Sequence, residues 1–157
     1  MSTNTAHTVH PDAHPTRSPA TGRRSVDAGR LLPLVLEVNA ATSLAAGAVG
    51  LVAARWSADR LGLDDTGWVR LVGAGLILFA LAVAASSRLR GPALARAARL
   101  ISGADAAWVA ATVAVVAAGV LSTGGVVIAV VMGVGVLDLG LAQLWLASRL
   151  ARTAGSR

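Results

Sequence analysis

The stretch from Gly124 to Ser148 constrains the fold most, because it runs for 25 residues with one charged side chain, Asp138. About 20 helical residues, at a rise of 1.5 Å each, cross the hydrocarbon core of a bilayer. The stretch is therefore expected to be a membrane-spanning helix. A carboxyl group in such a helix is costly against lipid, so Asp138 is expected to face protein or trapped water.

The chain contains four apolar stretches of this kind, separated by short polar segments. They cover residues 31–54, 68–86, 101–121 and 124–148. The turn Ser122–Gly125 is too short for anything but an antiparallel hairpin between the third and fourth spans. A cleaved signal peptide is the competing interpretation of the first span, but its run is longer than the usual apolar region of about 7–15 residues. The expected fold class is all-α, a transmembrane antiparallel four-helix bundle.

The domain organisation follows from these spans. With 157 residues, the chain has room for one domain, which we place at residues 30–150. Residues 1–29 are rich in Thr, Ser, Pro and His and poor in large apolar side chains, which predicts a disordered cytoplasmic tail. Residues 151–157 are expected to form a short basic cytoplasmic tail.

The residue types that are missing exclude several kinds of chemistry. The chain has no Cys, which rules out disulfides and thiol catalysis. All three histidines, His7, His10 and His14, lie in the N-terminal tail, where Pro11 and Pro15 break any helix that would align them. No serine has the setting of a nucleophile elbow. We therefore expect no metal, no cofactor and no enzymatic activity.

The basic residues predict the orientation in the membrane. All 14 are Arg and give a net charge of +6, but they lie in short segments beside the spans, which argues against nucleic acid as a partner. Eleven fall on the side of the two termini and of residues 87–100, and three, Arg55, Arg60 and Arg70, fall on the other side. The positive-inside rule then predicts a multi-pass protein of the plasma (inner) membrane with both termini in the cytoplasm.

The five acidic and amide side chains within the predicted spans form the candidate site: Glu37, Asn39, Asp105, Asp138 and Gln143. By helix rise, all of them fall in the cytoplasmic half of the bilayer. One interpretation is a cytoplasm-facing pocket in which the three acids bind a proton, a cation or a cationic group. The other is that each acid bonds to a neighbouring helix or reaches the headgroups. Glu37 is two residues from Asn39, about 200° around the helix, and so points elsewhere.

Small residues on the first and fourth spans predict faces on which helices approach closely. Ser43, Gly47 and Gly50 form such a face on the first span. Gly133, Gly135 and Gly140 recur along the fourth span. Helix packing is the favoured role of these three glycines, and an unwound ligand site is the alternative.

Several short motifs resemble those of four-span membrane proteins of high-GC bacteria and, more distantly, the DoxX-like family. They are the small-residue first span from Asn39 to Gly50, the LGL element at 61–63, GAGLILFA at 73–80, Asp105 three residues before Trp108, and Gln143 near the end of the fourth span. The likeness covers about residues 31–148. It implies a four-helix membrane fold and a link to respiratory or thiol-stress membrane complexes, and the absence of Cys argues against a thiol role.

The function that these features favour is a non-catalytic accessory or interaction subunit, with the lipid bilayer and a second copy or another membrane protein as partners. The alternative is a small proton- or cation-coupled transporter, or a channel-like oligomer, that uses the acidic residues. A transporter predicts that Glu37, Asp105 and Asp138 converge on one solvent-reachable cavity. An accessory subunit predicts that they point to different neighbours and that a Gly/Ala surface stays open to a partner.

Overall fold

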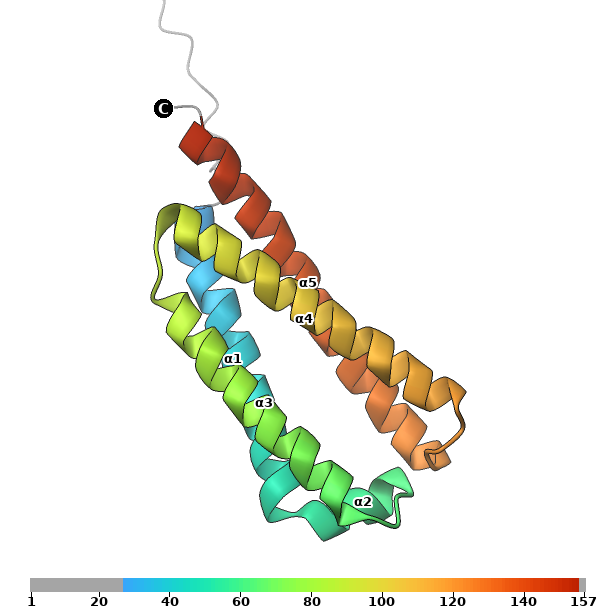
Figure 1. Ribbon diagram of the computed structural model, residues 1–157. Helices are drawn as coiled ribbons and strands as arrows, with labels where there is room; N and C mark the ends of the chain where they lie inside the picture. The colour runs from blue at the N-terminus through green and yellow to red at the C-terminus, as the bar shows by residue number, and fades with distance from the viewer. Residues whose placement is uncertain (1–26, 156–157) are drawn as a thin grey trace, which may run out of the picture.

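The computed structural model describes residues 27–155, which form five helices and no strand (Figure 1). The helices are α1 (Ala28–Val52), α2 (Ala54–Leu61), α3 (Thr66–Ser87), α4 (Gly91–Ala117) and α5 (Thr123–Gly155). All of them except α2 are long and apolar enough to cross a membrane. The predicted fold class, an all-α bundle of four spanning helices, is confirmed.

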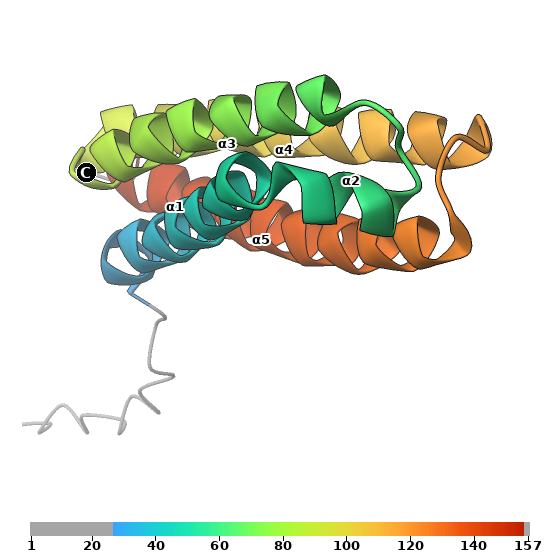
Figure 2. The same cartoon turned by 90° about the horizontal axis from the view of Figure 1, so that it is seen from below.

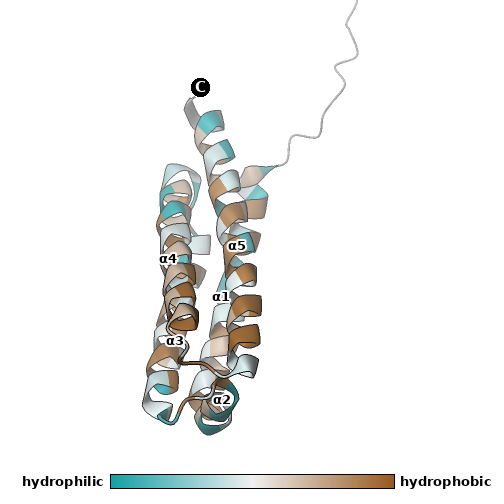
Figure 3. Ribbon diagram, turned by 90° about the vertical axis from the view of Figure 1, so that its right-hand side faces the viewer, coloured by the Kyte–Doolittle hydropathy of each residue, from teal (hydrophilic) through white to brown (hydrophobic). Residues whose placement is uncertain are grey.

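The surface of the bundle is what a membrane protein requires. Large apolar side chains stand outward along every long helix, including Leu78 at 69% exposure on α3 and Val131 at 65% on α5. Brown, hydrophobic segments accordingly predominate in the middle of the bundle, and teal segments gather towards its two ends (Figure 3). A soluble protein rarely exposes such a continuous apolar surface. The chain is therefore a multi-pass membrane protein.

The four long helices form two antiparallel pairs, α1 with α3 and α4 with α5 (Figures 1 and 2). Residue 28, the α3–α4 connection and residue 155 lie at one end of the bundle, which we call the terminal end. Helix α2 and the α4–α5 turn lie at the other end, which we call the α2 end. The two pairs diverge between these ends (Figure 1).

Glycines bring α1 and α3 into backbone contact. A Cβ added to Gly47 would lie 2.7 Å from the Gly73 carbonyl oxygen, and one added to Gly73 would lie 2.9 Å from that of Gly47. Gly50 faces the Cα of Gly73 at 3.2 Å. Helices without a Cβ at the crossing point approach closely and gain dispersion energy along their whole interface, which is the main packing force in lipid. These three glycines therefore hold the first pair together.

All four long helices meet at the terminal end in one apolar core. Its buried residues are Ala28, Leu32, Leu36 and Ala40 of α1, Val83 of α3, Leu94, Ala95, Ala98 and Ile101 of α4, and Leu146 and Ala147 of α5. Leu32, Leu36 and Val83 have no exposed surface. This core joins the two helix pairs at the end that carries the candidate polar residues.

A second junction joins the pairs at the α2 end, where the C-terminus of α2 meets the N-terminus of α5. Ser122 donates its backbone N–H to the Leu61 carbonyl at 2.9 Å and its hydroxyl to the Arg60 carbonyl at 3.0 Å. Gly62 has a left-handed φ of 78° and Gly125 lies against Leu61, where a Cβ would come within 2.6 Å of its carbonyl oxygen. The last carbonyls of α2 are thus bonded by the residue that precedes α5.

Helix α2 lies within residues 54–68, the polar segment that separates the first two predicted spans. Ala54 and Ala58 pack against Val69, while Trp56 is 55% and Trp68 65% exposed. Tryptophans exposed at one end of a membrane bundle are typical of the boundary between lipid and water. We therefore place the bilayer surface at the level of α2.

Some helices begin or end at other residues than the predicted spans do, because local capping stops or extends them. Helix α4 runs unbroken from Gly91 and ends at Ala117, four residues before the predicted end of the third span, because Gly119 adopts a left-handed φ of 69°. The turn therefore covers 118–122 rather than 122–125. Helix α1 begins at Ala28, and α5 continues to Gly155, into the predicted basic tail. The rest of the predicted tails lies outside the described residues.

Candidate functional site

The five predicted polar residues fall into a buried group and an exposed group. Asn39, Asp105 and Gln143 come together at the junction of α1, α4 and α5, with exposed fractions of 1%, 4% and 0%. Glu37 on α1 and Asp138 on α5 are exposed at the surface of the chain. The three acids therefore do not share one pocket within the chain.

The centre of the buried group is a hydrogen bond between helices from the two pairs. Asn39 donates its side-chain amide to Asp105 Oδ2 at 3.0 Å, across 66 residues of sequence. Ser43, one turn along α1, lies with its hydroxyl 3.4 Å from Asn39 Oδ1 and donates to it. The carboxyl oxygen accepts a hydrogen bond and the amide N–H donates one, so the two side chains are complementary. Their bond fixes the register of α1 against α4.

Ser102 extends the group to α5, and the sequence interpretation missed it. Its hydroxyl lies 3.1 Å from the Gly140 carbonyl and 3.4 Å from Gln143 Oε1. With one proton to donate, it bonds mainly to the nearer Gly140 oxygen. Ser102 is three residues before Asp105, hence on the same face of α4, and that spacing is the signal that could have identified it.

Gln143 is the least satisfied member of the group. It has no exposed surface, and its Nε2 has no hydrogen-bond partner among the described residues. Gly140 lies beside Asp105, since a Cβ added to it would be in van der Waals contact with the Asp105 Cβ at 3.5 Å. We name Asn39, Ser102, Asp105 and Gln143 the buried polar cluster.

The spacing of the residues explains why the other two acids stay outside. Asp138 is two residues before Gly140, and Glu37 is two residues before Asn39. Two helical residues correspond to about 200°. Because Gly140 and Asn39 face Asp105, both acids point to the opposite sides of their helices. Asp138 therefore lies at nearly the depth of Asp105 but on the far side of α5.

The predicted packing glycines also divide. Gly47 and Gly50 lie at the contact of α1 with α3, Ser43 joins the polar group, and Gly140 lies against Asp105. Gly133 and Gly135, in contrast, have open space at the Cβ position, where no atom lies within 4 Å, although Gly133 itself is buried. Gly135 is exposed beside Asp138, one turn away. A packing role for Gly135 would therefore need a partner from outside the chain.

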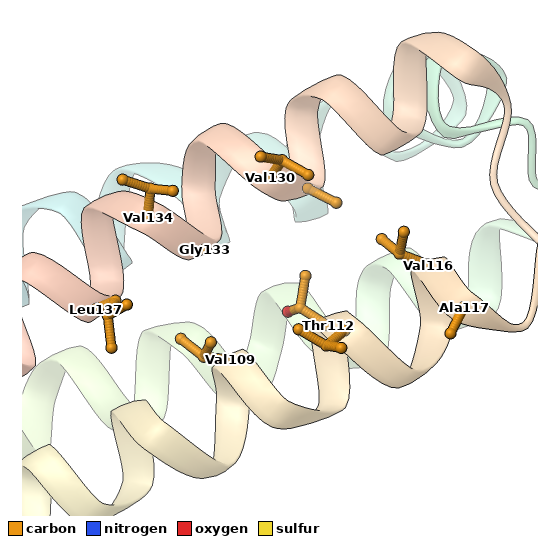
Figure 4. A pocket seen from close by; sticks show the side chains of 10 residues that line it. Val109, Thr112, Val116, Ala117, Val130, Gly133, Val134 and Leu137 are labelled. Atoms are coloured by element: carbon orange, nitrogen blue, oxygen red, sulfur yellow. The ribbon is translucent and has the colours of Figure 1, made fainter.

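Gly133 lines a pocket of about 310 Å³ between α4 and α5, in the half of the bundle towards the α2 end. Val109, Val116, Val130 and Leu137 point into the space between the two helices (Figure 4). Thr112, the polar residue of the lining, donates its hydroxyl to the Trp108 carbonyl of its own helix at 2.9 Å. The pocket thus offers no polar group to a ligand and contains none of the candidate acids.

A metal site is also absent from the part of the chain that the structure describes: residues 27–155 contain no group of three His, Asp or Glu side chains that could hold an ion. The tail histidines, His7, His10 and His14, lie outside the described residues. Within the chain, the buried polar cluster joins α1, α4 and α5 through side-chain hydrogen bonds.

Comparison with known proteins adds no further constraint: no family model, no curated protein and no solved structure matches the chain. The resemblance to DoxX-like proteins stays a prediction from short motifs.

Proposed function

We propose that the protein is a non-catalytic accessory or interaction subunit of the plasma (inner) membrane, with both termini in the cytoplasm. The observation that carries this proposal is the separation of the three acids. Asp105 is buried and accepts a hydrogen bond from the Asn39 amide of its own chain, whereas Glu37 and Asp138 stand outward on different helices. A transporter needs its titratable groups on one path across the membrane. In this arrangement the three acids do not lie on a common path.

Asp138 provides direct support for an interaction role. It lies about 15 residues from either end of the apolar segment Thr123–Arg152, so it is near the middle of the span. A carboxyl group at the centre of a lipid-facing helix costs about 2.5–3.5 kcal/mol on insertion scales. An exposed acid at that depth is favourable only when another protein covers it and bonds to it. A protein whose task is association supplies that cover.

The orientation is tested by reporter fusions. Fusions after Arg90 and after Arg157 should report a cytoplasmic location, and a fusion at Asp64 should report an external one. The physical reason is the excess of Arg at the terminal end over the α2 end. An external C-terminus would contradict the proposed orientation and the even number of spans.

Transport is tested by proton and cation flux in liposomes. Purified protein reconstituted at high density, with a pH or potassium gradient across the bilayer, should give the same flux as protein-free liposomes. Asp105→Asn serves as the matched control, since it keeps the shape and the hydrogen bond of the side chain. A flux that the native chain supports and Asp105→Asn abolishes would replace the accessory role by the transporter alternative.

Association is tested by a photo-crosslinking amino acid at Leu141, which is 56% exposed and one turn from Asp138. In native membranes it should form an adduct with a protein. The same amino acid at Leu78 of α3, which is 69% exposed and has no acid beside it, is the control and should react with lipid. Lipid adducts alone at both positions would contradict the interaction role.

A further inference from the structure

One side of α5 is apolar, exposed and centred on Asp138. We call it the outward α5 face. Its residues are Val127, Val131, Val134, Asp138, Leu141 and Trp145, each exposed. They lie within about 80° of one another by helical geometry, opposite the buried residues Gly140 and Ala147. All six residues are exposed, so no other helix of the described chain covers this face. Brown, hydrophobic segments recur along α5 (Figure 3).

Asp138 distinguishes this face from an ordinary lipid-facing surface. Within residues 27–155 its carboxyl makes neither a hydrogen bond nor an ion pair. The bilayer core offers no water to replace them. Whatever covers the face must therefore bring a hydrogen-bonding group to the middle of the membrane.

We propose that the outward α5 face is the interface between two copies of this chain, related by a twofold axis along the bilayer normal, with the two Asp138 carboxyls bonded to each other. The proposal rests on the interaction role above and names its partner.

The geometry of a membrane selects a second copy. Two copies inserted in the same orientation have parallel α5 helices, and every residue of one lies at the depth of its equivalent in the other. A twofold contact then pairs Asp138 with Asp138 without any adjustment of depth. Carboxyl groups are self-complementary, because one donates its O–H and the other accepts it.

Gly135 supports the close approach that this bond needs. It is exposed one turn from Asp138, and the space around its Cβ position is empty for 4 Å. A small residue beside a polar one at a helix crossing lets the two backbones come near enough for side chains to bond in lipid. Within the described chain nothing packs on the Cβ position of Gly135, whereas in the dimer Gly135 lies at the edge of the outward α5 face, about 60° from Asp138 around the helix.

Single-cysteine crosslinking tests the proposal directly, because the natural chain has no Cys. Val131→Cys places a thiol two turns from Asp138 on the same face. Oxidation in native membranes should give a disulfide-linked species of about twice the 15.7 kDa chain mass. Met132→Cys is the matched control at the same depth, about 100° around the helix and 46% exposed, and should stay monomeric.

The role of the carboxyl is tested in the Val131→Cys background. Asp138→Asn keeps a self-complementary side chain and should retain the crosslinked dimer. Asp138→Leu removes the bond and should reduce the dimer yield about three- to thirtyfold, as for hydrogen bonds between membrane helices. Thermal unfolding of each variant in detergent checks that the monomer remains folded.

The outcomes separate this proposal from the proposed function. A Val131→Cys chain that stays monomeric, or that crosslinks no better than Met132→Cys, overturns the dimer. If the photo-crosslinker at Leu141 instead forms an adduct with a different protein, the dimer is wrong and the interaction role stands. If neither experiment gives a protein adduct, both are wrong.

Discussion

Gly73→Leu is expected to destabilise the folded chain by about 3 kcal/mol or more, because the new side chain has no space. Its Cβ alone would lie 2.9 Å from the Gly47 carbonyl oxygen and 3.1 Å from the Gly50 carbonyl carbon. These are backbone atoms, so the clash is relieved only by separating α1 from α3. Overpacking typically costs about 1–3 kcal/mol where neighbouring side chains are able to move aside. Here the neighbouring atoms belong to the backbone of α1, so a whole helix must move. Thermal unfolding in detergent measures the loss.

Gly75→Leu is the matched control for this substitution. Gly75 lies two residues further along the same helix, and the space around its Cβ position is empty for 4 Å. Leucine there should leave stability unchanged or raise it slightly, since glycine is about 0.8–1.0 kcal/mol less favourable in a helix than alanine and leucine ranks close to alanine. Equal losses at the two positions would mean that α1 and α3 do not cross at Gly47 and Gly73.

Substitution by leucine is expected to have opposite effects at Asp105 and Asp138. Asp105→Leu removes the acceptor for Asn39 and leaves a buried amide unpaired, which costs about 1–3 kcal/mol. Asp138→Leu breaks no bond within the chain and removes an acid from the span, so monomer stability should stay constant or rise. Unfolding in dilute detergent gives both values.

The asparagine variants provide the controls for this pair. Asp105→Asn keeps an oxygen that accepts from Asn39, so it should lose much less stability than Asp105→Leu. Asp138→Asn should behave like the native chain in the monomer. A destabilising effect of Asp138→Leu as large as that of Asp105→Leu would show that Asp138 has a partner inside the chain, and the outward α5 face would no longer be free.

Composition and pattern were sufficient to predict the architecture. The length of each apolar run predicts the four spans, and the spacing of Gly47 and Gly50 predicts a close-packing face on α1. Local capping moved the ends of helices, as at Gly119, where a left-handed residue stops α4 four residues early. Such endings depend on backbone conformation that an apolar pattern does not specify.

The candidate site was predictable only in part. Helical geometry separates Glu37 from Asn39, and the same argument applied to Asp138 and Gly140 would have separated Asp138 from the buried polar cluster. The bond from Asn39 to Asp105 could not be derived from the sequence, because the relative register of α1 and α4 is set by packing at the terminal end. Depth alone places all five residues in the same half of the bilayer and does not say which ones touch.

A double-mutant cycle between Asn39 and Asp105 tests the central claim, that Asp105 is held by the Asn39 amide of its own chain and not grouped with the other acids. Alanine substitutions, singly and together, should give a coupling free energy of about 0.6–2 kcal/mol in detergent unfolding. The cycles of Asp105 with Glu37 and of Asp105 with Asp138 should be additive within about 0.5 kcal/mol. Coupling of Asp105 to Glu37 and Asp138, with none to Asn39, would contradict the account and restore the shared acidic pocket.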